Sequence, residues 1–246
     1  MEAGTETTTG AQAQAGAPAR SALIVGASRG LGFAIAGEYL GRGWNVIGTA
    51  RAGSGGKLRG LAGTSAGRCR VETLDVTEAG EVASLRAREA GWRLDLLFVN
   101  AGVMNEGGET IGEVSTEEFV RVMVTNALGP MRVIERFEDL VTPDGIIGVM
   151  SSGLGSVANN QSGGYEVYRA SKAALNTLMR SFAARHAGGR RTFLVMAPGW
   201  VRTDMGGPGA TLSIEQSIPH LVTTMEAQRG KPGVQYLDYL GRAVPW

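Results

Sequence analysis

The stretch Ser21-Ala-Leu-Ile-Val-Gly-Ala-Ser-Arg-Gly-Leu-Gly32 decides the fold of this chain. Its first half is a short apolar run that ends in glycine, which is typical of a strand buried in a parallel sheet. Its second half has the spacing Gly-x-x-x-Gly-x-Gly and leads into a helical pattern of apolar residues. A strand, a glycine turn and a helix in this order place backbone N–H groups against a diphosphate. The stretch therefore predicts a nucleotide-binding turn, although a tight strand–helix connection would share its pattern.

Strands and helices alternate along the rest of the chain. Apolar segments predict strands over 21–26, 44–50, 70–77, 94–99, 145–152 and 192–197, and a short one near 234–237. Helical patterns cover 77–91, 115–140, 165–186 and 213–228, and Ser115 and Glu118 offer a capping box to the second of these helices. The glycine-rich residues 51–63 read as a loop. The alternation predicts a single α/β, doubly wound (Rossmann) domain over residues 20–246, with a mostly parallel seven-stranded sheet and helices on both faces.

Composition narrows the class of protein. The 246 residues are 43% hydrophobic and 19% charged with a net charge of +1, which points to neither a nucleic acid nor a membrane partner. The lone Cys69 excludes an intramolecular disulfide and fits a reducing compartment, so we expect a cytoplasmic protein. Two histidines and one cysteine argue against a structural zinc site. Residues 1–19 have almost no large apolar side chain and no secretory signal, and we expect a disordered tail there.

Candidate ligand-binding residues follow six of the predicted strands. Doubly wound sheets bind ligands at the carboxyl ends of their strands. The residues at these ends are Gly26, Arg51, Asp75, Asn100, Ser152 and Pro198. Their agreement in position is the strongest physical argument that this edge of the sheet forms a site.

Two arginines bear on the choice of cofactor. An acidic residue at the end of the second strand would accept the ribose hydroxyls of NAD, but Arg51 stands there, and Arg29 lies inside the glycine turn. Two cations near a ribose favour a 2′-phosphate, so we expect NADP(H) over NAD(H), unless either arginine is only a solvated surface charge. Asp75 could face the adenine edge or cap the helix that Thr77 opens.

Tyr168 and Lys172 lie four residues apart on a predicted helix, so their side chains share one face. A nearby ammonium lowers the pKa of a phenol, and the pair is therefore a plausible proton donor and acceptor for carbonyl and alcohol chemistry. A snorkelling lysine beside a half-buried tyrosine would give the same spacing. Asn126, in the middle of another helix among apolar residues, is either a structural hydrogen-bonding hub or part of a site.

Taken together, these motifs resemble the short-chain dehydrogenase/reductase family from about Ser21 onward. They occur in the family's order: Gly26-x-x-x-Gly30-x-Gly32, Asp75, Asn100-Ala-Gly102, Asn126, Ser152, Tyr168-x-x-x-Lys172 and Pro198-Gly199. The segments 168–176 and 198–206 and the pair Pro245-Trp246 are similar to the C-factor or sniffer-like carbonyl reductase branch.

The sequence departs from the family pattern at three places. Val25 replaces the usual Thr before the first glycine, and Val99 replaces the first Asn of the usual Asn-Asn-Ala-Gly. Ser152 lies sixteen positions before Tyr168, which indicates an insertion in the loop between them. Ser151 is adjacent, and we choose Ser152 because the family's serine is the second of such a pair.

The resemblance implies a mechanism. Ser152 would polarise a substrate carbonyl, a hydride would pass from the nicotinamide to the carbonyl carbon, and Tyr168 would donate the proton. Lys172 would lower the pKa of Tyr168 and hold the nicotinamide ribose, and Asn126 would hold a water that links Lys172 to solvent. The catalytic residues are then Asn126, Ser152, Tyr168 and Lys172. The cofactor would contact Gly26, Ser28, Arg29, Gly30, Leu31, Gly32, Arg51, Asp75, Val76, Asn100, Ala101, Gly102, Tyr168, Lys172, Pro198, Gly199, Val201 and Thr203.

Substrate and assembly are less closely specified. The loop 153–164, Met104, Tyr165, Trp200 and residues 205–212 would line a moderately apolar pocket for a carbonyl compound or alcohol. In the family, the helices over 115–140 and 165–186 form subunit contacts, so we expect a homodimer or homotetramer. Two other functions stay open: a cofactor-binding signalling or regulatory protein of C-factor type, and a biosynthetic protein that uses the pocket for a non-redox step.

Overall fold

The computed structural model describes residues 19–106 and 108–246. The tail predicted over residues 1–19 therefore lies, apart from Ala19, outside the described residues. None of the helices in these two ranges is long and apolar enough to cross a membrane.

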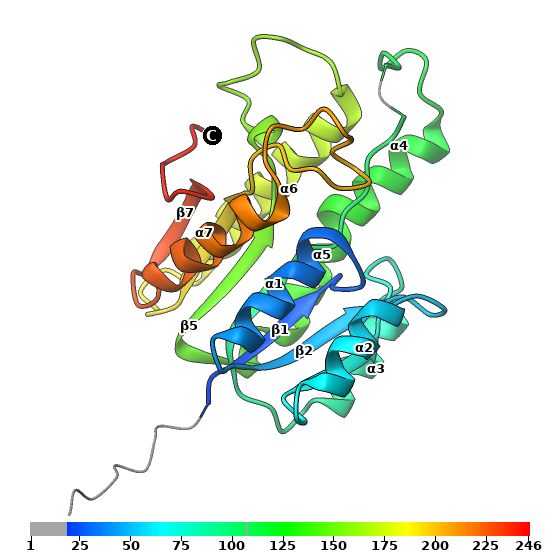
Figure 1. Cartoon of the computed structure of the whole chain (residues 1–246). Coiled ribbons are helices and arrows are strands. Elements are labelled where there is room, and N and C mark those ends of the chain that lie inside the picture. Colours follow the sequence, from blue (N-terminus) through cyan, green and yellow to red (C-terminus); the bar gives the residue numbers. More distant parts are fainter. Residues whose placement is uncertain (1–18, 107) are drawn as a thin grey trace, which may run out of the picture.

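Seven strands form one sheet in the order β3-β2-β1-β4-β5-β6-β7 (Figure 1). Every neighbouring pair is parallel. The strands are β1 Ser21–Val25, β2 Asn45–Ala50, β3 Cys69–Thr73, β4 Leu94–Val99, β5 Val141–Met150, β6 Thr192–Ala197 and β7 Gly233–Asp238. The predicted doubly wound α/β fold is confirmed, and its sheet is parallel throughout.

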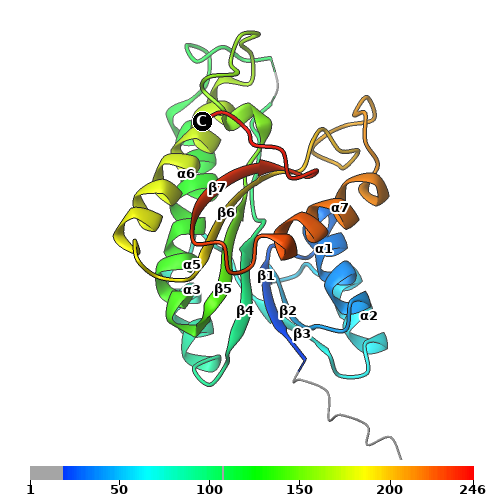
Figure 2. The same ribbon diagram turned by 90° about the vertical axis from the view of Figure 1, so that its left-hand side faces the viewer.

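Helices cover both faces of the sheet (Figure 2). One face carries α1 Gly30–Gly41, α2 Gly56–Thr64 and α7 Ile214–Ala227. The other carries α3 Ala79–Arg88, α5 Gly129–Phe137 and α6 Glu166–Arg185. The remaining helical segments are α4 Thr116–Met123, the π-helical turn η1 Val124–Leu128, and the 3₁₀ turns η2 Glu138–Leu140 and η3 Gly153–Gly155.

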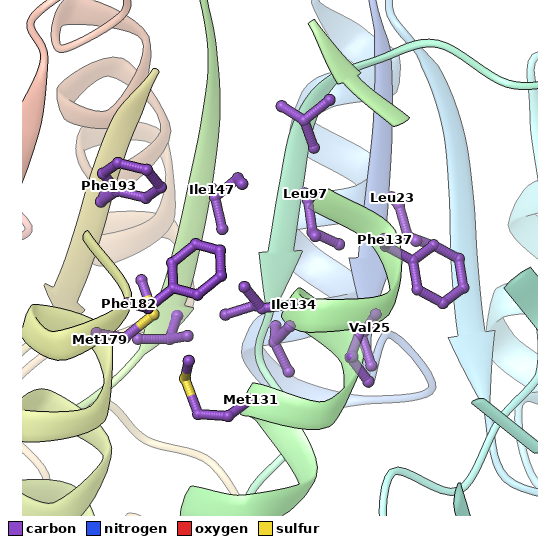
Figure 3. Close-up of a cluster of buried hydrophobic side chains, with 14 of the residues drawn as sticks. Leu23, Val25, Leu97, Met131, Ile134, Phe137, Ile147, Met179, Phe182 and Phe193 are labelled. Carbon is purple, nitrogen blue, oxygen red and sulfur yellow. The ribbon is translucent and has the colours of Figure 1, made fainter. Parts of the chain in front are cut away.

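The core consists of two apolar layers that share the sheet. Alternate residues of each strand point to opposite faces, so Leu23 and Val25 of β1 join one layer while Ala22 and Ile24 join the other. Figure 3 shows the first layer, in which β1, β4, β5 and β6 pack against α5 and α6. Its labelled side chains are Leu23, Val25, Leu97, Met131, Ile134, Phe137, Ile147, Met179, Phe182 and Phe193. A sheet buried on both faces explains the continuous apolar runs in the sequence.

The prediction of a loop over 51–63 is wrong, because most of this segment forms α2. Three glycines of α2 make this segment a poor helix by propensity alone. Packing compensates, since Leu58 is fully buried against the sheet. A Cβ added to Gly48 of β2 would lie 2.9 Å from Leu58 Cδ2, so the missing side chain of Gly48 leaves the room that Leu58 fills. A tertiary contact thus overrides local preference.

The helix predicted over 115–140 is interrupted. The π-helical turn η1 separates α4 from α5, and η2 follows α5. The capping box at its start forms only in part. The Glu118 N–H donates to Ser115 Oγ at 3.1 Å, but the Glu118 carboxylate pairs with Arg121 at 2.6 Å instead of returning to the backbone of Ser115.

Replacing Tyr39 by phenylalanine is expected to stabilise the protein. The Tyr39 side chain is fully buried beside Trp44, and its hydroxyl has no hydrogen-bond partner among residues 19–106 and 108–246. Burial and the nearby Glu226 raise the pKa of this phenol, which stays neutral. Since an unsatisfied buried hydroxyl costs about 1–3 kcal/mol, Tyr39→Phe should raise the free energy of unfolding by about 1 kcal/mol in urea titrations. A loss of stability of similar size would show that the hydroxyl has a partner.

Candidate active site

The parallel sheet brings the candidate residues to one edge, because all seven strands end on the same side (upper edge in Figure 2). Each of the first six strands ends just before, or within two residues of, a candidate. The residues that follow these strands are Gly26, Arg51, Asp75, Asn100, Ser152 and Pro198. The predicted gathering of these residues is therefore present, and their contacts show which of them support the edge.

The glycine turn after β1 is shaped by two close contacts. Gly26 has a φ of +83°, and a Cβ there would lie 2.8 Å from the Ala101 backbone. A Cβ at Gly32 would lie 2.1 Å from the Gly26 carbonyl oxygen. Asn100 Nδ2 donates to that same carbonyl at 3.0 Å, so Asn100 fixes the turn from the neighbouring strand.

The first turn of α1 is open to an anion. Helix α1 begins at Gly30, and its N-cap residue, Arg29, makes no side-chain cap. The N–H groups of a helix's first turn have no partner inside the helix and attract negative charge. Ser28 and Leu31 are half-buried on this turn. The predicted diphosphate cradle therefore has its backbone donors in place.

Arg29 is not a free cation in this arrangement. Its guanidinium pairs with Asp204, and both side chains are well exposed. Asp204 belongs to the segment between β6 and α7, whose Thr203 lies beside Gly30. The ion pair thus links the glycine turn after β1 to the segment that follows β6. Sequence reasoning missed Asp204, since no motif marks it as a partner of Arg29.

Arg51 is exposed and makes no side-chain hydrogen bond or ion pair within the described part of the chain. Its carbonyl accepts from the Ser54 N–H at 3.0 Å and from Ser54 Oγ at 2.8 Å, which turns the chain toward α2. Arg51 therefore stands at the end of β2 with its guanidinium available.

Asp75 and Val76 have structural contacts. Asp75 Oδ1 accepts from the Thr77 N–H at 2.9 Å and from Thr77 Oγ1 at 2.7 Å, so the carboxylate closes the turn before α3. Helix α3 itself begins two residues beyond Thr77, at Ala79. The Val76 side chain is buried against Gly129, and the Val76 carbonyl oxygen also lies against that glycine.

The segment after β6 lies across the same edge of the sheet from the glycine turn. Pro198 is buried and its carbonyl accepts from Ser217 Oγ at 2.7 Å, which fixes the segment to α7. Gly199 has a φ of +81°, and a Cβ there would lie 2.6 Å from Leu212. Val201 is buried and forms a β-bridge with Leu212.

Tyr168 and Lys172 are both buried on α6. Burial raises the pKa of Tyr168 to about 12. The Ser152 hydroxyl lies close enough to the phenol to lower this pKa, but its effect is smaller than that of burial. Burial lowers the pKa of Lys172 to about 8. Lys172 Nζ donates to the Met150 carbonyl at 3.0 Å and lies 5.8 Å from the centre of the Tyr168 ring. The pair is therefore adjacent, as its spacing predicts.

The predicted effect of Lys172 on Tyr168 is not found in the protein alone. Burial dominates the pKa of the phenol, with Ser152 and Tyr236 as the other causes. The reason is that burial lowers the pKa of Lys172 to about 8, so Lys172 has lost its charge before the phenol titrates.

The two adjacent serines have different surroundings. Ser151 is buried, and its Oγ donates to Asn176 Oδ1 at 2.6 Å. Ser152 is half-buried, accepts from the Leu154 N–H at 3.1 Å through Oγ, and influences the pKa of Tyr168. Of the two serines, Ser152 is therefore the one whose hydroxyl lies beside Tyr168.

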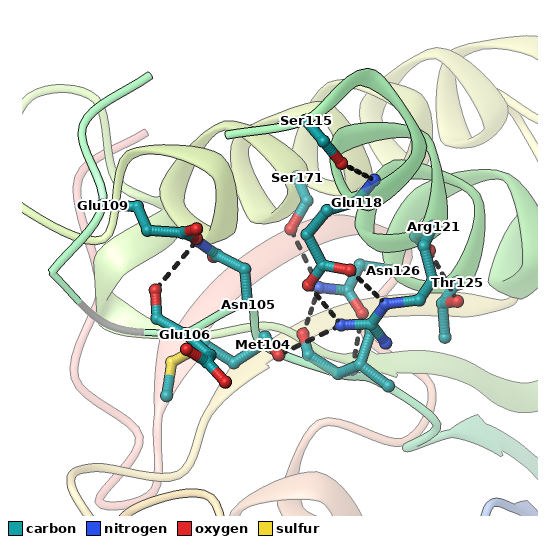
Figure 4. Close-up of polar contacts among 11 residues, drawn as sticks. Met104, Asn105, Glu106, Glu109, Ser115, Glu118, Arg121, Thr125, Asn126 and Ser171 are labelled. Carbon is teal, nitrogen blue, oxygen red and sulfur yellow. Dashed lines mark hydrogen bonds and ion pairs between the residues drawn. The ribbon is translucent and has the colours of Figure 1, made fainter. Parts of the chain in front are cut away.

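Asn126 is fully buried in the π-helical turn η1 (Figure 4). Its Nδ2 donates to the Val103 carbonyl at 2.7 Å and to Ser171 Oγ at 2.9 Å, and its Oδ1 accepts from the Val103 N–H at 2.8 Å. The side chain thus ties the segment after β4 to α6, one residue before Lys172. The same segment is held farther along by Arg121, which donates to the Met104 carbonyl at 3.3 Å.

Apolar side chains are exposed around this edge. Tyr165, Trp200 and Met205, all predicted to line the pocket, are at least two-fifths exposed. The inserted loop 153–164 is anchored by Arg169, a residue that sequence reasoning did not single out. Arg169 is buried and donates to the Gly164 carbonyl at 2.8 Å and the Gly163 carbonyl at 3.0 Å. The one feature of the sequence that could have pointed to Arg169 is its position immediately after Tyr168.

Comparisons with known proteins agree with this arrangement. A family model described as Enoyl-(Acyl carrier protein) reductase matches residues 26–223. A short-chain dehydrogenase/reductase from Burkholderia multivorans with bound NADP is 55% identical with a TM-score of 0.91, covering 93% of this chain and 100% of that chain. A carbonyl reductase from Pseudomonas aeruginosa PAO1 in complex with NADP is 34% identical with a TM-score of 0.85, covering 93% and 100%. The C-signal protein of Myxococcus xanthus is 34% identical over 155 residues, or 62% of this chain and 93% of that protein.

The buried Lys172 is expected to make stability depend on pH in a defined direction. Its pKa is about 8 in the folded protein against an ordinary value of 10.5, so between these values the unfolded chain binds a proton that the folded protein does not. Stability should therefore rise with pH from about 8 to about 10.5. The free energy of unfolding of the wild type minus that of Lys172→Met should increase across this window by up to roughly 3 kcal/mol. A difference independent of pH would contradict the lowered pKa.

Proposed function

Because the chain belongs to the short-chain dehydrogenase/reductase family, we propose that it transfers a hydride between NADP(H) and a carbonyl compound or the corresponding alcohol. Membership of this family and the similarity to NADP-bound structures support the general assignment of the chain as an NADP-dependent oxidoreductase. The observation that carries the finer proposal is the buried Tyr168, within the influence of the Ser152 hydroxyl and one helical turn from Lys172.

The edge of the sheet fits a dinucleotide. The close contacts at Gly26 and Gly32 leave a surface of backbone without side chains, and the first turn of α1 offers uncapped N–H groups to a diphosphate. Gly102 extends this bare surface toward Lys172, since a Cβ there would lie 3.2 Å from Lys172 Nζ. When bound, NADPH supplies the hydride. The candidates Gly26 to Gly32, Asn100 to Gly102 and Pro198 to Thr203 would hold it.

Tyr168 is suited to donate a proton at neutral pH. With its pKa raised to about 12, the phenol stays protonated, so it can give its proton to the oxygen of a carbonyl as that oxygen gains negative charge. Ser152 would share that oxygen through its hydroxyl hydrogen, because Ser152 Oγ already accepts from the Leu154 N–H. Oxidation of an alcohol needs the phenolate instead, and burial of Tyr168 opposes it.

Lys172 and Asn126 would support Tyr168 in different ways. Lys172 is placed to bind the nicotinamide ribose and to supply positive charge beside the phenol. Asn126 uses its side chain on Val103 and Ser171, so we assign that side chain a positioning role. The water that Asn126 was predicted to hold, linking Lys172 to solvent, stays a prediction.

The substrate class and a second candidate function follow from the exposed apolar side chains and the relatives. Tyr165, Trp200 and Met205 favour an apolar carbonyl compound, in keeping with the carbonyl reductase relative. The similarity to C-signal favours a signalling role as the second candidate. That role would need cofactor binding without turnover.

We also propose that the protein forms a homodimer or homotetramer. Large apolar side chains are exposed on α4, η1 and α6, the elements predicted to form subunit contacts. They are Phe119, Val120, Leu128 and Leu178. Covering this apolar surface with a second copy would remove it from water.

Replacing Tyr168 by phenylalanine should abolish turnover and leave NADPH binding nearly intact. The change removes the proton donor but keeps the ring that packs beside Lys172. Loss of NADPH absorbance with aromatic aldehydes and quinones, and NADPH binding by calorimetry, measure the two effects. Wild-type rates in this variant would disprove the mechanism. Tight NADPH binding by the wild type without turnover of any carbonyl would favour the signalling function.

Replacing Arg51 by aspartate should shift cofactor preference toward NADH. A free guanidinium at the end of β2 would pair with the 2′-phosphate, and a carboxylate there would repel it, so the ratio of NADPH to NADH affinity should fall at least about tenfold. Arg93→Asp is the matched control, since Arg93 is exposed at the opposite edge, just before β4. An equal effect of both variants would mean that Arg51 acts only through net charge.

A further inference from the structure

The hydroxyl of Tyr236 donates a hydrogen bond to the carbonyl oxygen of Ser152. Tyr236 lies in β7, at the far edge of the sheet from β3, and it is not part of any motif quoted above. We propose that Tyr236 is a positioning residue that acts through Ser152, an inference that rests on the proposed reductase function.

The Ser152 carbonyl is held from two sides. The Gly155 N–H donates to it at 2.9 Å and closes the 3₁₀ turn η3, and the Tyr236 hydroxyl approaches it from the sheet. On the same residue, Ser152 Oγ accepts from the Leu154 N–H at 3.1 Å. The backbone of Ser152 is thus fixed at the point where β5 has ended and the inserted loop begins.

These contacts determine where the Ser152 hydroxyl can point. One lone pair of Oγ is occupied by the Leu154 N–H, so the hydroxyl hydrogen is left for Tyr168 or for a substrate oxygen. If the Ser152 carbonyl lost its bond to Tyr236, η3 would be held by the Gly155 N–H alone. The Ser152 hydroxyl would then move with a looser turn. Misplacing a group that contacts the reacting oxygen lowers kcat more than it weakens substrate binding.

Tyr236 is itself rigidly placed. It is buried in β7 and pairs in register with Val195 of β6. Its ring packs against Trp246, with 5.4 Å between ring centres, and the Arg180 guanidinium lies 4.6 Å from the centre of the Trp246 ring. The Trp246 carbonyl accepts from the Ala158 N–H at 3.1 Å. The segment after β7, red in Figure 2, therefore runs back to the same loop that begins at Ser152.

Two further buried polar side chains lie near the Tyr236 hydroxyl. Ser151 and Asn176 lie close enough to lower the pKa of Tyr236, in opposition to burial, and Tyr236 in turn raises the pKa of Tyr168. Ser151 and Asn176 are buried and bonded to each other, and Asn176 also donates to the Gly155 carbonyl at 3.1 Å. Both ends of η3 are thus held by the same buried group of side chains.

A double-mutant cycle tests the proposal. Tyr236→Phe removes the hydroxyl and keeps the ring on Trp246. With 4-nitrobenzaldehyde and NADPH as the first probes, it should lower kcat about tenfold, the effect of losing one hydrogen bond, with KM for NADPH unchanged. In a Ser152→Ala background, the same change should lower kcat less than about twofold. Equal losses in both backgrounds would overturn the proposal, because a purely structural role does not depend on the Ser152 hydroxyl.

Hydrogen exchange separates this proposal from the proposed function. Amides of residues 152–158 should exchange faster in Tyr236→Phe than in the wild type, whether or not any carbonyl is turned over. Tyr39→Phe is the matched control, since it removes a buried tyrosine hydroxyl that lies in α1 and should change neither exchange in 152–158 nor kcat. Unchanged exchange in Tyr236→Phe would overturn the positioning role even if the wild type is an active reductase. Faster exchange in Tyr236→Phe, together with a wild type that turns over no carbonyl, would refute the reductase function alone.

Discussion

Removal of Tyr168 and Lys172 from water is the constraint on which the rest of the site depends. Burial raises the pKa of the phenol and lowers that of the ammonium, so it favours the neutral form of both groups and moves their pKa values apart. Neither shift would exist on an exposed helix. They arise because α6 lies against the carboxyl end of β5, where the Met150 carbonyl receives Lys172.

The fold supplies this burial as a by-product of its topology. A fully parallel sheet needs helices on both faces, and those helices bring side chains from distant parts of the sequence to the edge where the strands end. Asn100 and Asn126 then fix the segments around the glycine turn and β4 through backbone atoms. Some residues that the sequence suggested as ligand contacts therefore have polar groups free at this edge of the sheet. Others use their side chains to hold the backbone of neighbouring segments in place.

The sequence predicted the architecture and the positions of the candidates well, since apolar runs and glycine spacings report local geometry. It failed where distant contacts decide. Helix α2 depends on Leu58 filling space beside Gly48, and the pairing of Arg29 with Asp204 joins segments 175 residues apart. The pKa of Tyr168 could not be predicted from its distance to Lys172, because burial is its largest cause and Lys172 is not among the others. Asp75, which the sequence left between two roles, closes a turn.

The loop between Ser152 and Tyr168 is fastened mainly through its backbone, with one further contact from Arg169 to Ser162 Oγ at 3.1 Å. Arg169 grips the carbonyls of Gly163 and Gly164, and the Ala158 N–H meets the Trp246 carbonyl. The exposed side chains of residues 157–161 take no part in these anchors. Mutations there can accumulate without loosening the loop, so the surface beside α6 can change while the buried contacts beneath it are preserved.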